Sequence, residues 1–178
     1  MQATRLKIRI KIAIEKFFFY ASISLALGYI DTLIPKPVPM LRYGLANLPL
    51  ILTVMEGKFT NSVIALAAKI SASSLVGLNF LSPALPASML GSLGSWFSMW
   101  AFSKTIGKNS SPVSTSAIGA LANTWIQSAS LYLILGKDMG KVIIALLPVA
   151  MLQGLAGAIF NGVVAGSTVK YITRFEKI

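Results

Sequence analysis

Six apolar segments, each separated from the next by proline, glycine or charged residues, dominate this sequence of 178 residues. An α-helix rises about 1.5 Å per residue, so roughly 20 apolar residues cross the hydrocarbon core of a bilayer. The segments are Ile12–Ile34, Gly44–Glu56, Phe59–Leu81, Ala84–Phe102, Val113–Leu135 and Val142–Ile172. We therefore predict an all-α, polytopic membrane protein with six transmembrane helices. The second segment is short, and we expect it to cross at a tilt or to be half-unwound at its start.

The composition supports an apolar environment. Hydrophobic residues make up 55% of the chain and charged residues 12%, whereas a soluble domain keeps about a quarter of its residues charged. The five acidic residues are too few for an acidic surface, and the lack of cysteine and histidine removes the usual metal ligands and general bases. We expect no cofactor, no metal site and no catalytic activity. A phosphate-binding glycine loop is also absent, so the chain alone cannot drive transport with ATP.

Lysine and arginine are distributed unevenly around the six segments, and cytoplasmic loops carry an excess of both. With the N-terminus inside, the cytoplasmic set is Arg5, Lys7, Arg9, Lys11, Lys16, Lys58, Lys104, Lys108, Lys170, Arg174 and Lys177. The outer set is Lys36, Arg42, Lys137 and Lys141, and Lys69 falls inside a segment. This bias predicts an even number of spans with both termini in the cytoplasm.

The same distribution argues against nucleic acid as a partner, although the net charge is +11. The positive residues lie at the ends of apolar segments and are not gathered on one face, as a phosphate-binding patch requires. We expect one transmembrane domain over residues 1–178, in the bacterial cytoplasmic membrane. Residues 1–11 form its basic cytoplasmic N-terminus, residues 12–172 the six-helix bundle, and residues 173–178 a cytoplasmic tail.

Lys69 is the most unusual candidate for a functional residue, because it lies near the middle of the third segment. An ammonium group there costs roughly 2.5–3.5 kcal/mol on insertion scales, so it must face a partner or a water-filled cavity. We give ligand binding and structural pairing with Glu56 or Glu15 equal weight.

Side-chain amides provide the second part of the candidate site. Asn123 and Gln127 share one face of the fifth helix, and amides in hydrocarbon must find hydrogen-bond partners. Together with four further amides they predict an interior polar cavity: Asn47, Asn79, Gln153 and Asn161. Arg42 and Lys36 would stand at its outer mouth beside the loop Pro35–Pro39. Since its ionisable groups are mostly basic, the cavity suits an anionic or carbonyl-rich ligand.

Small residues recur at helical spacing in the first segment. Ser22 and Ala26 form one pair, and Ser24 and Gly28 form another. Small side chains let two helices approach closely in lipid, where packing and not hydrophobic exclusion drives association. Each pair indicates either packing within the chain or docking of another membrane subunit.

The stretch from Asp31 to Asn47, DTLIPKPVPMLRYGLAN, resembles the proline-rich loop and helix start of the Gx transporter family, which also carries the name heptaprenyl diphosphate synthase component I. Ser114 to Gln127 and Pro148 to Gly166 are similar to the family's fifth and last helices. The resemblance covers roughly Ile12 to Ile172. Two positions depart from the family pattern: Asp31 replaces a glutamate, and Tyr43 replaces an aliphatic residue.

This resemblance implies a fold like the substrate-binding S components of energy-coupling factor (ECF) transporters. Such a fold has six helices and a loop between the first two that covers an outward-facing site. Its first helix presents small residues, here Ser22 and Ala26, to an ECF-type transmembrane coupling subunit, which in turn works with ATPases. The sequence therefore favours a substrate-capture subunit for a small anionic or aromatic metabolite. The alternatives are a non-catalytic membrane subunit for polyprenyl diphosphate or quinone biosynthesis and, less favoured, a membrane anchor for an extracytoplasmic redox system.

The predicted topology is open to a direct test, because the chain has no native cysteine. A single cysteine introduced at Ile178 should stay unlabelled by a membrane-impermeant thiol reagent in intact cells and become labelled after permeabilisation. A cysteine at Lys141, in the outer set, is the positive control. Labelling of the residue-178 cysteine in intact cells would exclude a cytoplasmic C-terminus.

Overall fold

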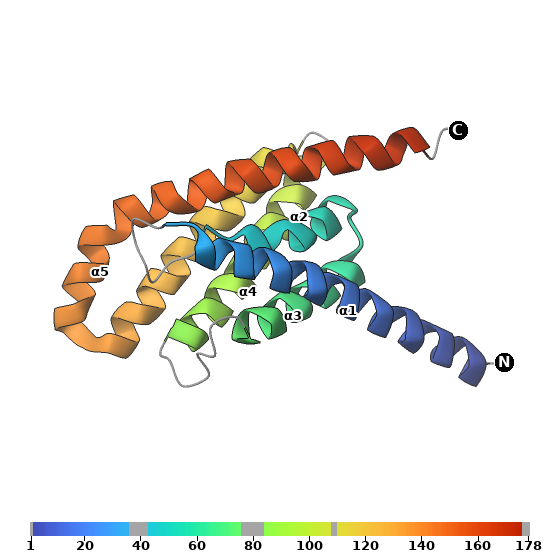
Figure 1. Ribbon diagram of the computed structural model, residues 1–178, viewed down its shortest axis with the longest axis horizontal. Coiled ribbons are helices and arrows are strands. Elements are labelled where there is room, and N and C mark those ends of the chain that lie inside the picture. Colours follow the sequence, from blue (N-terminus) through green and yellow to red (C-terminus); the bar gives the residue numbers. More distant parts are fainter. Residues whose placement is uncertain (1, 36–42, 76–83, 108–109, 176–178) are drawn as a thin grey trace.

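The computed structural model describes residues 2–35, 43–75, 84–107 and 110–175, and within these ranges the regular elements are all helices (Figure 1). In chain order they are α1 (Gln2–Leu33), the 3₁₀ helix η1 (Leu45–Asn47), α2 (Leu48–Met55), α3 (Phe59–Leu75), α4 (Ala84–Ile106) and α5 (Pro112–Phe175). Helix α1 packs mainly against α3, and α4 packs mainly against α5. The prediction of an all-α fold is confirmed.

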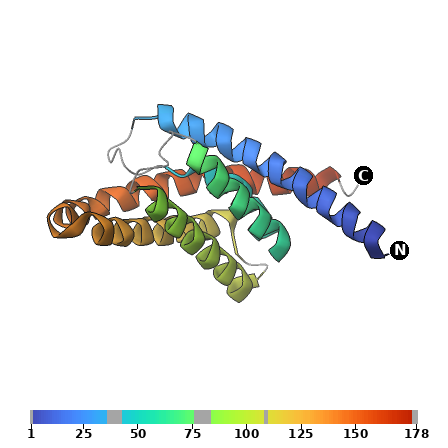
Figure 2. The same cartoon turned by 90° about the horizontal axis from the view of Figure 1, so that it is seen from below.

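Helix α5 consists of two antiparallel limbs, which correspond to the fifth and sixth predicted helices. The limbs join at Gly136, whose backbone is not helical (φ 80°, ψ −178°), a conformation that residues with a Cβ rarely adopt. The two limbs lie side by side in both views (Figures 1 and 2). Their close contact depends on glycine: Gly162 of the second limb lies against Val113 of the first, with no room for a side chain between them.

The second predicted segment forms the centre of the bundle. It begins as η1 and continues as the eight-residue α2, as expected for a segment unwound at its start. Leu50, Ile51 and Val54 of α2 are at most 2% exposed and pack with Ala65 of α3 and Met99 of α4. Because eight residues of α-helix extend only about 12 Å, α2 is too short to cross a bilayer by itself.

Several helix ends differ from the predicted segments. Helix α1 already begins at Gln2, well before Ile12, and α4 continues to Ile106 instead of ending at Phe102. The predicted bounds followed the ends of apolar runs, but lysine and arginine are good helix formers and let a helix continue past the apolar residues. The predicted end of the third helix at Leu81 lies outside the described residues, and the described helix ends at Leu75.

Two described helical stretches are apolar and long enough to cross a membrane by length and composition: Pro112–Gly136 and Gly140–Val169. A third apolar stretch, Leu45–Met55, is shorter. Helix α1 begins and α5 ends at the same end of the bundle (Figures 1 and 2). Membrane association is thus supported, while the six-span topology and its orientation stay predictions.

The second limb of α5 also holds the start of η1 in place through a glycine. A Cβ added at Gly157 would overlap the backbone carbonyl of Tyr43. We expect Gly157→Ala to destabilise the protein by about 1–3 kcal/mol, because either the helix or the backbone near Tyr43 must shift. Thermal unfolding of the purified protein in detergent would measure this loss.

Gly166→Ala is the matched control, on the same limb of α5. A Cβ there would lie 3.6 Å from Pro112 Cγ, an ordinary van der Waals contact. Replacing glycine by alanine in an open helical position stabilises by up to about 1 kcal/mol, so this variant should unfold at the same or a higher temperature. Equal stability of the two variants would show that Gly157 is not a close-contact position.

Candidate functional site

Lys69 of α3 is buried and reaches the neighbouring helix α4. Its side chain is 6% exposed, and its Nζ donates to Ser92 Oγ at 2.7 Å. The Ser92 hydroxyl donates in turn to the Ser88 backbone carbonyl at 2.8 Å, which leaves its lone pairs facing the ammonium. Hydrogen bonds with a charged donor are roughly twice as strong as neutral ones. This contact therefore offsets part of the cost of burying the ammonium group.

The two acids considered as partners of Lys69 make contacts elsewhere. Glu56 accepts a hydrogen bond from Asn61 Nδ2 at 3.1 Å, and Asn61 Oδ1 accepts one from Lys16 Nζ at 3.0 Å. Glu15 lies 3.9 Å from Lys11 on the surface of α1. Glu56 thus belongs to a chain of hydrogen bonds that joins α1 to α3, and Glu15 forms an ion pair within α1.

Asn123 and Gln127 lie on the face of α5 that packs against α4. They are one helical turn apart, and Gln127 Nε2 donates to Asn123 Oδ1 at 3.4 Å. Opposite them stands Gly91, where an added Cβ would lie 2.6 Å from Asn123 Oδ1 and 2.5 Å from Gln127 Cγ. The glycine lets both amides pack directly on the α4 backbone, as small residues do between membrane helices.

Gly91 and Ser92 are consecutive residues, so polar groups from α3 and α5 contact α4 at the same level, on faces of the helix about 100° apart. Lys69 approaches from α3, and Asn123 and Gln127 approach from α5. We call this group of residues the α4 cluster. It combines a cation, one hydroxyl group and amide donors and acceptors, which suit an oxygen-rich anionic group better than an apolar one.

A second polar group surrounds the start of η1, where the chain returns to the bundle after the proline-rich loop. Asp31 of α1 is 1% exposed, and its carboxylate accepts hydrogen bonds from the backbone N–H groups of Tyr43 at 3.1 Å, Gly44 at 2.8 Å and Leu45 at 3.3 Å. These N–H groups precede or begin a helix and have no intrahelical acceptor. Gly44 has φ 83°, a left-handed conformation that glycine adopts without strain.

Two buried amides flank Gly44. Asn161 of α5 is 2% exposed and donates from Nδ2 to the Gly44 carbonyl at 2.9 Å, while Asn47 is 8% exposed. The Oδ1 atoms of Asn47 and Asn161 have no hydrogen-bond partner among the described residues. Buried acceptors of this kind are normally satisfied by a donor on a ligand or by an ordered water molecule. We call Asp31, Gly44, Asn47 and Asn161 the η1 cluster.

The predicted site residues are thus divided between two clusters. Lys69, Asn123 and Gln127 gather on α4, and Asn47 belongs to the η1 cluster. The remaining two, Arg42 and Asn79, lie outside the described residues, as do most of the residues of the predicted loop.

Sequence reasoning placed Asn161 among the amides of the polar cavity but left Asp31 and Ser92 out of the candidate site. Asp31 carried a usable signal, because an acid within an apolar segment must be satisfied by specific partners, as Lys69 must. Ser92 carried none, since serine in a helix commonly donates to its own backbone and is then indistinguishable from its neighbours.

The two small-residue pairs of α1 face opposite directions. Ser24 is 1% exposed and donates to the Ala46 carbonyl at 3.3 Å, and Gly28 is also buried. Ser22 and Ala26 are exposed. Ser24 and Gly28 therefore serve packing within the chain, and Ser22 and Ala26 remain accessible on the outside of the bundle.

The chain matches the family described as Heptaprenyl diphosphate synthase component I over residues 20–168. No curated protein and no solved structure matches it. Because the match covers most of its length, the chain belongs to this family, as its loop and helix motifs indicated.

Proposed function

We propose that this member of the heptaprenyl diphosphate synthase component I family is the substrate-binding membrane subunit of a bacterial transporter, comparable to an ECF S component. It captures a small anionic or aromatic metabolite within the helical bundle and is not itself an enzyme. Transport then requires a partner that supplies energy, which in an ECF-type system is a transmembrane coupling subunit with its ATPases.

The observation that carries this proposal is the α4 cluster. A buried ammonium and two amides come from different helices onto neighbouring residues of α4. Ionisable groups inside a membrane protein are expensive and usually mark substrate paths or binding sites. The Oδ1 atoms of Asn47 and Asn161, which have no hydrogen-bond partner in the described part of the chain, add acceptors in the η1 cluster. The bundle interior thus offers both donors and acceptors to a polar metabolite.

Native mass spectrometry of gently purified protein is the first test, because it reports the mass of whatever ligand the protein retains. A mass in the range of a small metabolite supports the proposal. A bound polyprenyl diphosphate would instead favour a membrane subunit that presents a lipid to a synthase, the alternative that the family description suggests.

Lys69→Met should weaken binding of an anionic ligand by more than tenfold, about 1.4 kcal/mol or more, because it removes the only charge of the α4 cluster. Isothermal titration with the compound identified by mass spectrometry would measure the affinity, and thermal unfolding would confirm that the variant remains folded.

Lys16→Met is the matched control for the Lys69 variant. Lys16 is partly buried and, like Lys69, donates to a polar side chain, but its acceptor is Asn61, outside both clusters. Its loss should leave the affinity unchanged within about twofold, a change under 0.5 kcal/mol. If the two variants bind equally well, Lys69 is a structural residue and the α4 cluster is not the binding site.

The outward pair on α1 supports a docking surface for the energising partner. Ser22 and Ala26 are exposed, one turn apart, and larger apolar side chains such as Leu25 (40% exposed) and Tyr29 (62% exposed) flank them. Small side chains within an apolar stripe are the arrangement that permits close helix contact in lipid.

Replacing Ser22 and Ala26 together with leucine should abolish co-purification of an ATPase-containing complex, because larger side chains prevent close helix approach. Ala67→Leu with Ser71→Leu is the matched control, since this pair is also small, exposed and one turn apart, but on α3. The α3 variant should retain the complex. Co-purification that survives the α1 substitutions would refute this docking surface and leave the ligand site to be judged by its own test.

A further inference from the structure

The first turns of α1 combine apolar and basic residues in an unusual order. From Arg5 to Ile12 basic and apolar residues alternate strictly, in the sequence RLKIRIKI. Ala13, Ile14 and Glu15 follow. We call residues 5–15 the basic segment of α1. Strict alternation would separate the two kinds of residue onto opposite faces of a strand, but the structure makes this segment helical.

In a helix, alternate residues lie about 200° apart, so neither kind of side chain is confined to one face. The exposed fractions show this directly: Ile8 is 54% exposed, Ile10 50%, Ile12 46% and Ile14 50%. Lys7 and Lys11 are exposed as well. The segment is therefore apolar and basic all round, unlike an amphipathic helix that lies flat on a membrane with one apolar face.

Helix α1 is longer than a bilayer core requires. Its 32 residues correspond to about 48 Å, compared with about 30 Å of hydrocarbon. In the predicted topology, in which the apolar run Ile12–Ile34 crosses the bilayer, the first turns of α1 lie beyond the hydrocarbon. This start of α1 extends beyond the neighbouring α3 (Figures 1 and 2). If water surrounded the basic segment, its four isoleucines would be exposed to solvent. If hydrocarbon surrounded it, its lysines would have no counter-charge. The headgroup layer accommodates both, because lysine stems lie against apolar groups while their ammonium groups reach polar ones.

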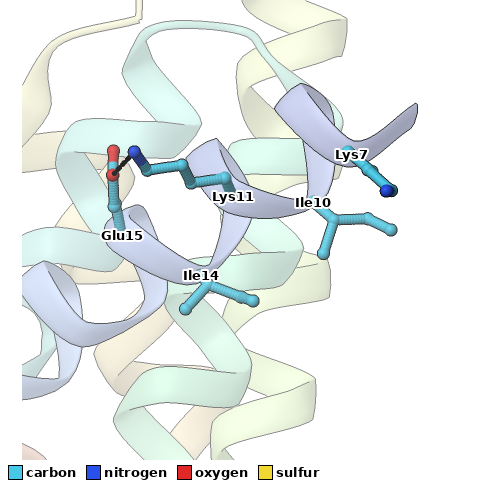
Figure 3. Close-up of a pocket in the computed structure, with 5 residues that line it drawn as sticks. All are labelled: Lys7, Ile10, Lys11, Ile14 and Glu15. Carbon is cyan, nitrogen blue, oxygen red and sulfur yellow. Dashed lines mark ion pairs between the residues drawn. The ribbon is translucent and has the colours of Figure 1, made fainter. Parts of the chain in front are cut away.

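A shallow hollow of about 430 Å³ on this segment has the corresponding chemistry (Figure 3). Lys7, Ile10, Lys11, Ile14 and Glu15 line it. Lys11 lies 3.9 Å from Glu15, but both side chains are more than half exposed, and such surface pairs contribute little. Lys11 thus remains able to exchange this carboxylate for a phosphate.

We propose that the basic segment of α1 stands upright in the headgroup layer and binds anionic phospholipids. Headgroup phosphates contact Lys7 and Lys11, whose ammonium groups point in different directions (Figure 3). The first carbons of the acyl chains lie over Ile10 and Ile14. Charge complementarity selects this occupant: the segment carries Arg5, Lys7, Arg9 and Lys11 against the single acid Glu15. This role is separate from ligand capture in the α4 cluster.

The test compares lipid retention by the full-length protein in a neutral detergent, with phosphatidylglycerol and phosphatidylcholine as probes and native mass spectrometry as the readout. The unaltered protein should retain phosphatidylglycerol in preference to phosphatidylcholine. Lys7→Gln with Lys11→Gln should reduce its affinity for phosphatidylglycerol by about tenfold, because each surface lysine contributes to the attraction of anionic lipid. Raising the salt from about 0.05 M to about 0.5 M should weaken the binding to the unaltered protein in the same direction, a readout that needs no variant.

Lys58→Gln with Lys141→Gln is the matched control, because it removes two exposed lysines from other parts of the chain. It should retain phosphatidylglycerol like the unaltered protein. Equal retention of the two lipids, or an equal loss in both double variants, would overturn the proposal. Complete displacement of phosphatidylglycerol by the same concentration of inorganic phosphate would also overturn it, since the hollow would then be a site for a free anion.

Discussion

The buried carboxylate of Asp31 holds the short central segment of this bundle in place. It accepts hydrogen bonds from three backbone N–H groups at the start of η1, which have no acceptor within the helix. Asn161 adds a hydrogen bond to the Gly44 carbonyl from the opposite side. Helices from the beginning and the end of the chain thus fix the same few residues, and α2 follows directly as a mostly buried helix.

The position of α2 determines how the surrounding helices meet. Because α2 occupies the centre, with Leu50 and Ile51 completely buried, α3 and α4 both pack against it. Lys69 then reaches Ser92 across the α3–α4 contact, and the amides of α5 rest on Gly91. Serine and glycine at these adjacent positions serve different purposes: Ser92 accepts a hydrogen bond from the charged ammonium group, and Gly91 makes room for two side chains. Small residues on α4 thus accommodate polar side chains that come from α3 and α5.

Much of this arrangement follows from sequence periodicity. Apolar runs predicted the helices, the shortness of the second run predicted its irregular start, and the four-residue spacing placed Asn123 and Gln127 on one face. Contacts between helices were harder to predict, because they depend on how the helices are rotated and how far along each other they lie. Nothing in the sequence distinguishes Ser92 from its neighbouring serines as the acceptor for Lys69. The start of α1 was also missed, because charge was taken as the end of a helix when it marks only the end of an apolar run.

In helix α1, residue spacing alone does not distinguish small residues that pack within the chain from small residues on the outer surface, whereas burial does. Ser22 and Ala26 have the same spacing as Ser24 and Gly28, yet the second pair is buried against the η1 segment and the first is exposed. Two positions along a helix correspond to a rotation of about 200°, so pairs offset by two residues necessarily face opposite sides. One helix can therefore contact the interior through Ser24 and Asp31 and remain free on its outer side. The same rotation spreads the alternating lysines and isoleucines around its first turns. The α-helical period thus gives α1 an interior face and an outer face, and the basic residues of its first turns give it an end with a different chemistry.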